Sequence, residues 1–210
     1  MRVRWYGHAC FCCEGGGVRL LTDPFSKEVG YPIPQETVDI VTVSHDHYDH
    51  NAVDLVPGSP VVVREPGKRE VKGIPIKGIS VFHDEVRGAK RGKNIVFVWE
   101  MEGLRLCHLG DLGHILEPVT VSEIGKVDLL FIPVGGIYTI DAKTAAKVVD
   151  QLQPRLVVPM HYKTPALTFE LAPVDEFLRY YENIRREKVL VCDAENLPEN
   201  QEVIVLDYKA

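Results

Sequence analysis

The feature that most constrains this sequence is a run of β-branched residues that leads directly into a cluster of histidines and aspartates. The run Val38–Val43 predicts a short strand that is buried on both faces. The next seven residues, from Ser44 to His50, read Ser-His-Asp-His-Tyr-Asp-His. Such a chain has to fold around a buried strand whose end carries three imidazoles and two carboxylates.

Histidine and aspartate at this spacing are typical metal ligands, because their nitrogen and oxygen donors suit zinc, iron or manganese. Alternate side chains of an extended segment share a face, so His45 and His47 are predicted to bind one ion together. Asp49 and His50 lie where the chain turns into a helix, and they can point at a second ion. The alternative is a polar loop with solvated histidines. Crowding three of the eight histidines into six residues is costly without an ion, which favours the metal site.

Three further candidate ligands, His83, Asp111 and His161, each follow an apolar run. Ligands at the same ends of several adjacent strands can converge on one rim of a sheet. Taken alone, each of the three is more simply explained as a hydrogen-bonded residue at the end of a strand. Together with the first motif, they favour a metal site built from several strands.

Short strands outnumber helices in the predicted order of elements, and the helices do not alternate strictly with them. The predicted strands are Val3–Tyr6, Ala9–Glu14, Val18–Thr22, Val38–Val43, Val61–Val63, Ile74–Phe82, Asn94–Glu100, Leu104–His108, Asp128–Pro133, Leu156–Pro159, Lys188–Cys192 and Val203–Leu206. The predicted helices are Asn51–Val56, Val121–Gly125, Asp141–Leu152 and Pro173–Arg186. The stretch Pro57–Gly73 is interpreted as turns between strands. The pattern predicts one domain over residues 1–210, with two packed sheets and helices outside them.

The motifs together resemble those of the metallo-β-lactamase superfamily. The resemblance rests on five segments: Trp5–Phe11, Thr22-Asp23-Pro24, the His-x-His-x-Asp-His run from His45 to His50, Gly110-Asp111, and Pro159–Tyr162. More narrowly, the chain is similar to small cytoplasmic metal-dependent hydrolases near L-ascorbate-6-phosphate lactonase. The N-acyl-phosphatidylethanolamine phospholipase D belongs to the same wider group.

The resemblance implies an α/β fold, an αββα four-layer sandwich of two mixed sheets with helices on the outer faces. It also implies two divalent metal ions, with zinc expected and manganese or iron as alternatives. In that arrangement His45, His47 and His83 bind the first ion, Asp49, His50 and His161 bind the second, and Asp111 bridges them. The implied activity is hydrolysis of an ester, lactone or phosphodiester by a bridging hydroxide, with Asp49 also transferring a proton.

The remaining histidines and Asp23 are expected to support this site. His8 and His114 can lie near the metal rim and orient the ligands. Asp23 either does the same or caps the turn before Pro24. His108 is expected to form a local hydrogen bond.

Three residues are candidates for contact with a small, anionic substrate. Lys93 belongs to the basic, glycine-containing loop Arg87–Asn94, which can hold a phosphate or carboxylate or can be a solvated loop. Lys163 follows His161 by two residues and can reach an anionic group. Tyr138 lies in the segment Gly135–Thr139, whose amides can face the site.

Charge and cysteine content limit the partners and the compartment. The 24 Lys and Arg residues against 30 Asp and Glu residues give a net charge of −6, which predicts neither nucleic-acid nor membrane binding. Five cysteines are an odd number for a disulfide framework, and no secretory signal is visible, so a reducing cytoplasm is predicted. Cys10, Cys12 and Cys13 are interpreted as small buried residues, with a small zinc site as the alternative.

Other functions remain as alternatives to hydrolysis. A di-iron redox protein of the same superfamily resembles His-x-Glu-x-Asp, whereas this chain has His47 in place of the glutamate. A metal-binding or regulatory protein without catalysis is another alternative. Missing residues in the metal-ligand set would support it, and none of them is missing. A nuclease would need an RNA-binding arm or a further domain, and an antibiotic-degrading enzyme would need a secretory signal.

Overall fold

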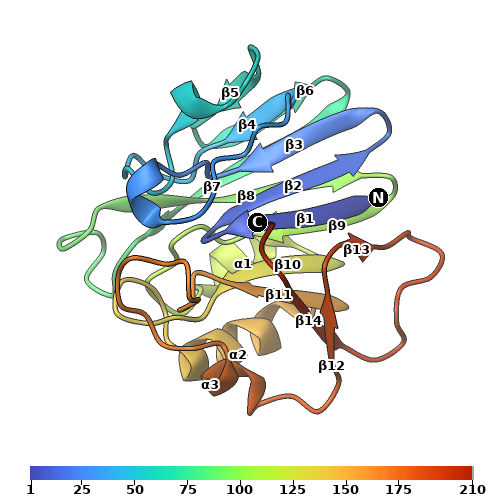
Figure 1. Cartoon of the computed structure of the whole chain (residues 1–210). Coiled ribbons are helices and arrows are strands. Elements are labelled where there is room, and N and C mark those ends of the chain that lie inside the picture. Colours follow the sequence, from blue (N-terminus) through green and yellow to red (C-terminus); the bar gives the residue numbers. More distant parts are fainter. Residues whose placement is uncertain (210) are drawn as a thin grey trace.

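Two β-sheets form the centre of the molecule, which we describe from a computed structural model covering residues 1–209 (Figure 1). The first sheet has six strands in the order β13-β1-β2-β3-β4-β5. Their bounds are β1 (Arg2–Gly7), β2 (Cys10–Gly15), β3 (Val18–Thr22), β4 (Ile40–Thr42), β5 (Val61–Val63) and β13 (Leu190–Val191). The strands from β13 to β3 are antiparallel, whereas β3, β4 and β5 run parallel to one another.

The second sheet has eight strands in the order β12-β14-β11-β10-β9-β8-β7-β6. Their bounds are β6 (Gly67–Val71), β7 (Ile74–Phe82), β8 (Lys93–Met101), β9 (Leu104–His108), β10 (Leu129–Pro133), β11 (Leu156–Met160), β12 (Ile184–Glu187) and β14 (Glu202–Leu206). The half from β12 to β9 is parallel, and the half from β9 to β6 is antiparallel. Both sheets are therefore mixed, as predicted.

The main core lies between the two sheets, and it follows the two-residue periodicity of the strands. On β1, Trp5 belongs to this core, whereas its neighbour Tyr6 belongs to a second apolar cluster on the outer face of the six-stranded sheet. An aromatic contact joins the two sheets, since the ring centroids of Phe11 on β2 and Phe131 on β10 are 4.5 Å apart. Within the eight-stranded sheet, Trp99 stacks on Phe131 at 6.1 Å. This packing holds the strand ends of both sheets at a common rim.

Helices cover the outer face of the eight-stranded sheet (Figure 1). They are α1 (Pro118–Ile124), α2 (Ala142–Leu152) and α3 (Asp175–Leu178). The α2 helix begins where Asp141 accepts a hydrogen bond from the Thr144 amide, and it buries a stripe that includes Ala145 and Val148. Over the six-stranded sheet the outer layer consists of loops and two short 3₁₀ helices, η1 (Lys27–Val29) and η2 (Val53–Leu55). The predicted sandwich architecture is confirmed. Among residues 1–209, none of the helices has the length and hydrophobicity needed to span a bilayer.

Two sequence predictions about elements were wrong. The predicted helix Pro173–Arg186 is interrupted: only Asp175–Leu178 is helical, and Ile184–Glu187 instead forms β12, which pairs in parallel with β14. Tertiary pairing overrides the helical propensity of these charged residues. The stretch Pro57–Gly73 contains a further edge strand, β6, which pairs with β7.

The remaining boundaries differ by a few residues. The helix predicted from Val121 starts earlier, at Pro118, because proline suits the first turn. The predicted helix Asn51–Val56 is only a 3₁₀ turn over Val53–Leu55. All five cysteines are buried and unpaired, which fits their interpretation as small core residues.

Candidate metal centre

The predicted metal ligands converge at the rim where strands of both sheets end. His45, His47, Asp49 and His50 follow β4 of the six-stranded sheet. The other three ligands come from the eight-stranded sheet, where they follow β7, β9 and β11: His83, Asp111 and His161. The fold thus brings together residues that are more than 100 positions apart in the chain.

Asp111 lies at the centre of this group. Its Oδ2 is 3.2 Å from the Nε2 atoms of both His83 and His161, and 3.9 Å from Nε2 of His45. Its Oδ1 is 3.3 Å from Nε2 of His50. The Asp111 carboxylate is buried and faces imidazoles from both sheets, as a bridging ligand would.

The cluster contains three overlapping sets of residues that could hold a metal ion, and within each set all the donor atoms lie within 4.8 Å of one another. They are His45-His47-His83, His45-His50-Asp111 and His8-Asp49-His50-His161. The first set matches the three ligands predicted for the first ion. The last set contains the three residues predicted for the second ion, together with His8.

The sequence placed His8 among the supporting residues, whereas the structure places it within the ligand cluster. Its Nε2 is 3.1 Å from Oδ2 of Asp49 and 3.2 Å from Nε2 of His50. His8 has a positive φ of 52° in the turn between β1 and β2. Its carbonyl oxygen accepts hydrogen bonds from the Trp5 indole, at 3.0 Å, and from the His161 amide, at 3.2 Å. The Gly-His-Ala turn after the first strand was the available signal, but it does not show where the imidazole points.

Asp23 holds the histidine motif in place by hydrogen bonds to His50 and Ser44. Its fully buried carboxylate accepts hydrogen bonds from Nδ1 of His50 at 2.9 Å, the Ser44 hydroxyl at 2.6 Å and the Ser44 amide at 2.8 Å. The bond to Nδ1 leaves Nε2 of His50 facing the cluster. Of the two roles expected for Asp23, orientation of a ligand is the one that these contacts support.

Other polar side chains, of which Asn94 and His108 are buried, hold the neighbouring ligands. Asn94 accepts a hydrogen bond from the Asp111 amide at 3.0 Å and donates one to the carbonyl of Leu109 at 2.8 Å. Nδ1 of His108 accepts the expected local hydrogen bond, from the Gly110 amide at 3.2 Å, and its Nε2 bonds to the distant carbonyl of Ala9 at 2.9 Å. His114 accepts a hydrogen bond from the Phe82 amide at 3.2 Å, so it supports the strand end before His83.

Burial sets the protonation of two histidines in the cluster. It lowers the pKa of His45 to about 3 and that of His8 to about 4, so both rings are neutral at pH 7. A neutral imidazole is the form that binds a metal ion. His50 behaves in the opposite way: burial works against its charge, but the Asp111 and Asp49 carboxylates raise its pKa well above the usual value.

The carboxylates of the cluster remain ionised. Burial by itself would raise the pKa of Asp111, but His161 and His50 beside it hold that pKa well below the usual range. Burial likewise acts against ionisation of Asp49, and His50 and His8 outweigh it, so the pKa of Asp49 is also lowered. Two anionic carboxylates among buried imidazoles form an environment that favours cations.

The donor set fits a divalent metal ion. Within residues 1–209, the buried Nε2 of His45 has no hydrogen-bond partner, although it points toward the Asp111 carboxylate. A buried polar atom without a partner is costly, and coordination to an ion would satisfy it. Imidazole nitrogens with carboxylate oxygens are the ligands that zinc, manganese and iron accept.

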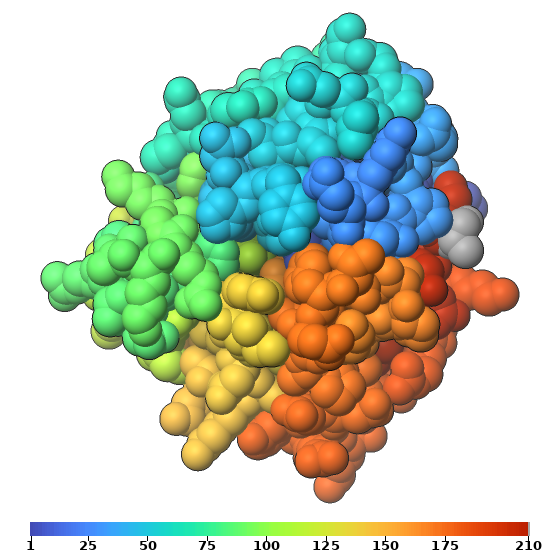
Figure 2. Space-filling view, turned by 60° about the vertical axis from the view of Figure 1, so that its left-hand side comes forward, coloured from blue at the N-terminus to red at the C-terminus, as the bar shows by residue number. Residues whose placement is uncertain are grey.

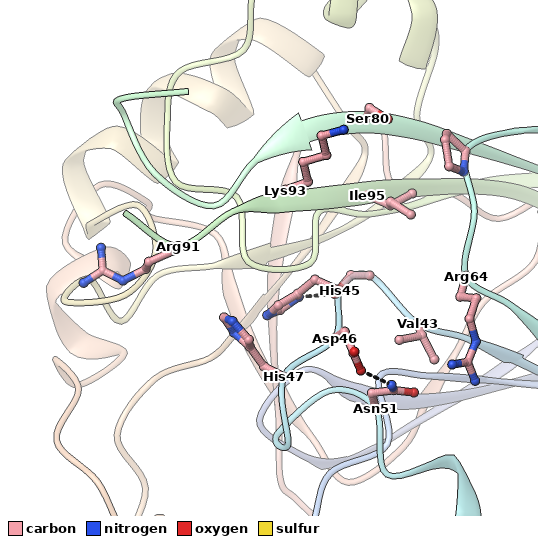
Figure 3. A pocket seen from close by; sticks show the side chains of 12 residues that line it. Val43, His45, Asp46, His47, Asn51, Arg64, Ser80, Arg91, Lys93 and Ile95 are labelled. Carbon is pink, nitrogen blue, oxygen red and sulfur yellow. Dashed lines mark hydrogen bonds between the residues drawn. The ribbon is translucent and has the colours of Figure 1, made fainter. Parts of the chain in front are cut away.

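Two cavities open beside the cluster. The first, of about 520 Å³, is lined by His45 and His47 at one end and by Lys93 on a wall (Figure 3). The second, of about 460 Å³, exposes the cluster itself and is bordered by aromatic rings. Its lining consists of Asp46, His47, Tyr48, Asp49, His83, Arg91, Asp111, Tyr138 and Phe169. Figure 2 shows the face where these segments meet, with the chain near residues 48, 90, 138 and 168 side by side.

The structure separates the three predicted substrate contacts. Lys93 lines the first cavity and Tyr138 the second. Lys163 lines neither: its Nζ donates to the carbonyls of Leu167 and Phe169, at 3.2 and 2.9 Å, and pairs with Glu170 at 3.0 Å. The Lys163 ammonium is therefore occupied by hydrogen bonds that hold its own loop together, and it is not placed to contact a substrate in either cavity.

Comparison with known proteins agrees with this geometry. Residues 2–161 match the family model described as the beta-lactamase superfamily domain. The chain belongs to the metallo-beta-lactamase superfamily. A "UPF0173 metal-dependent hydrolase" from Pyrobaculum arsenaticum is 32% identical over 91% of this chain and 96% of its own length. A UPF0173 protein from Pyrococcus furiosus is also 32% identical, over 92% of this chain and 96% of its own length.

Solved structures of the superfamily share the fold. A protein from Thermotoga maritima, described as a Zn-dependent hydrolase of this superfamily, is 45% identical, with a TM-score of 0.83 over 98% of this chain and 97% of its own. A metallo hydrolase from Ignicoccus hospitalis is 21% identical with a TM-score of 0.65 over 85% of this chain and 89% of its own, and this likeness concerns the fold alone. The chain is a metal-dependent hydrolase of the metallo-beta-lactamase superfamily.

Proposed function

We propose that this enzyme cleaves an ester, lactone or phosphodiester bond of a small molecule at a centre of two divalent metal ions. The observation that carries the proposal is the position of Asp111, whose two carboxylate oxygens face imidazoles from both predicted ligand sets. A carboxylate in that position can bridge two ions. Zinc is the expected metal, and manganese or iron suit the same donors.

The ligand assignment divides the cluster into two parts. His45, His47 and His83 would hold the first ion, in agreement with their common set of donor atoms. Asp49, His50 and His161 would hold the second, with His8 close enough to add a fourth donor. When bound, such a pair of ions would supply a hydroxide nucleophile at neutral pH and charge stabilisation for the developing oxyanion.

The chain's own residues add proton transfer and substrate positioning. The Asp49 carboxylate borders the second cavity and remains partly exposed there, with a side-chain exposure of 14%, so it can accept a proton from attacking water and pass it on. The ring of Tyr138 lies against Phe169 at a centroid distance of 6.0 Å, and both border the same cavity. These rings would contact an apolar part of the substrate.

The test begins with the metal content of the purified protein, measured by mass spectrometry. Activity on a panel of lactones, phosphodiesters and esters is then assayed with zinc, manganese or iron added. We expect a chelator to abolish turnover and the metal to restore it. Full activity in metal-free protein would contradict the proposal.

A variant at Asp49 tests the catalytic assignment. We expect Asp49→Ala to lower kcat by about 100-fold or more, because general-base catalysis contributes on that order. Asp54→Ala is the matched control, since Asp54 is an exposed residue in the 3₁₀ turn beyond the motif. An unchanged rate in Asp49→Ala protein that retains its metal would remove Asp49 from the mechanism.

A further inference from the structure

The first cavity is a cleft between the edges of the two sheets, directly beside the metal ligands His45 and His47 (Figure 3). One wall comes from the six-stranded sheet and the segment that follows β5, which carries Arg64. The opposite wall comes from β7 and β8 of the eight-stranded sheet and carries Ser80 and Lys93. The cleft therefore extends away from the ligand cluster, and its two walls come from different sheets.

The charges around this cleft are mainly positive. Arg64, Arg91 and Lys93 line it, against one carboxylate, that of Asp46. Asp46 already accepts a hydrogen bond from the side-chain amide of Asn51. Within residues 1–209 none of the three cations has an ion-pair partner, although the chain carries a net charge of −6. Unpaired cations grouped around one cleft of an acidic protein favour an anionic ligand.

The loop that leads to Lys93 is ordered from within. The Asp84 carboxylate accepts hydrogen bonds from four backbone amides, those of Val86, Gly88, Lys90 and Arg91, at 2.7 to 2.9 Å. The β8 strand then begins at Lys93. These bonds fix the path of the chain between the ligand His83 and Lys93, so Lys93 is presented from a structured position.

Arg91 has a different role from the other two cations. Its guanidinium donates to the carbonyl of Ile137 at 3.1 Å and lies 5.5 Å from the centre of the Tyr138 ring. In Figure 3 it extends away from Lys93 and Arg64, toward the second cavity. Arg64 and Lys93 are thus the two cations free to meet a ligand inside the first cleft.

We propose that this cleft is an anion subsite, in which Arg64 and Lys93 bind a phosphate or carboxylate group of the substrate while the scissile bond lies at the metal centre. The inference rests on the proposed hydrolytic function and narrows its substrates to anionic small molecules. Arg64 can form two parallel hydrogen bonds to such a group, and Lys93 supplies a point charge from the opposite wall. Ser80 adds a hydroxyl donor on the Lys93 side.

The direct test is calorimetric titration of the metal-loaded protein with inorganic phosphate and, separately, with acetate, at constant ionic strength. We expect phosphate binding to weaken about tenfold in each of Arg64→Gln and Lys93→Gln, and further in the double variant, because each loses a hydrogen bond to a charged group. Arg2→Gln and Lys147→Gln are matched controls. Arg2 is exposed on β1, and Lys147 on the outer side of α2.

The outcomes separate the subsite from the metal centre. Phosphate affinity that is unchanged in the double variant would mean that the anion sits on the metal ions alone, and would overturn the proposal, as would the absence of phosphate and acetate binding to the wild type. Weaker acetate binding in the same variants would extend the subsite to carboxylates. Metal content and thermal unfolding are measured for every variant, so loss of metal or of folding is recognised.

Kinetics then distinguish this inference from the proposed function. With mono(4-nitrophenyl) succinate, whose free carboxylate is separate from the scissile ester, we expect a higher KM in both variants, whereas the neutral 4-nitrophenyl acetate should be hydrolysed as by the wild type. If no compound of the panel is hydrolysed while phosphate binding still depends on Arg64 and Lys93, the proposed function fails and the anion subsite stands. If hydrolysis is observed and both KM values are unaffected, the subsite fails alone.

Discussion

Asp23 is a buried carboxylate that acts on the metal centre through its neighbour His50. It accepts three hydrogen bonds, from Nδ1 of His50 and from the hydroxyl and amide of Ser44. Removing its charge would weaken the hold on the His50 ring and reduce the basicity of that ligand. Asp23 therefore belongs to the candidate metal centre, although its carboxylate bonds to His50 and Ser44 behind the ligand cluster.

For Asp23→Asn we expect a metal affinity about 10–100-fold lower than that of the wild type, because the amide cannot replace the carboxylate as acceptor for all three donors. Competition with a chromogenic chelator measures this affinity. Asp54→Asn, which changes an exposed carboxylate, should bind metal as the wild type does. Equal affinities in the two variants would show that Asp23 only caps its turn.

At this scale the sequence predicted the cluster well, because its residues are defined by motifs. The spacing of His45 to His50 already implied ligands, and the resemblance supplied His83, Asp111 and His161. His8 and Lys163 could not be placed in the same way. The direction of the His8 ring depends on a turn with positive φ, and the Lys163 ammonium is bonded to carbonyls of a loop whose path the sequence does not give.

The α2 helix depends on a cap that also responds to pH. Asp141 accepts a hydrogen bond from the Thr144 amide at 2.8 Å, and Thr144, through its side chain first and then its amide, holds the pKa of Asp141 below its usual value. A carboxyl whose pKa is lowered by folding stabilises the fold above its unfolded pKa, about 3.9, and that contribution is lost as the pH falls through the folded value. Asp141→Ala should therefore lower the free energy of unfolding by about 1 kcal/mol at pH 7.

Urea unfolding at several pH values measures this effect. The difference between Asp141→Ala and the wild type should shrink as the pH falls below about 4, because the protonated carboxyl is a poorer acceptor. Asp150→Ala, on the exposed side of the same helix, is the control. A difference that stays constant down to pH 2.5 would show that the cap contributes without its charge.

Gly135 allows two strand ends to approach each other. It follows β10, and a Cβ added there would collide with the carbonyl oxygen of His161. We expect Gly135→Ala to destabilise the fold by about 1–3 kcal/mol and to displace His161, so the metal content should fall as well. Urea unfolding and metal analysis check both effects.

Gly16→Ala is a control that tests the effect of backbone strain alone, without a collision between the added Cβ and a neighbouring atom. Gly16 has a φ of 58° and nothing within 4 Å of the added Cβ, so this variant should lose only about 1 kcal/mol and should retain its metal. If Gly135→Ala behaved in the same way, the close approach at His161 would not constrain the ligand.

At the scale of elements, the sequence predicted strands with apolar runs and missed those without them. The strands β7 and β8 were found because their buried residues alternate or run continuously. The Ile184–Glu187 segment is mostly charged and pairs only along one edge, with β14, so its strand state comes from tertiary hydrogen bonding. Its sequence favours a helix equally well.

Over the whole molecule, burial protects the thiols. Desolvation raises the pKa of Cys12 to about 12 and that of Cys192 to about 11, so few thiolates exist at pH 8. Iodoacetamide should therefore modify the folded protein slowly, beginning with Cys192, which is 9% exposed. In urea all five thiols should react.

Mass spectrometry counts the modified thiols with time. The Cys192→Ser variant, in which the most accessible thiol is absent, should show a slower first modification in the folded state, and in urea its four remaining thiols should react. Rapid alkylation of Cys10, Cys12 or Cys13 in the folded state would mean that the six-stranded sheet opens locally.

The donors of the cluster come from two separate sheets: His8 and the His45–His50 motif from one, and His83, Asp111 and His161 from the other. An ion bound by donors of both groups would cross-link the two sheets, since the sheets could not separate without breaking its coordination bonds. We expect chelation to lower the melting temperature, in a calorimeter, by several degrees. A cell short of the right cation would then lose folded enzyme as well as turnover, and a weakened variant could be rescued by supplying that cation.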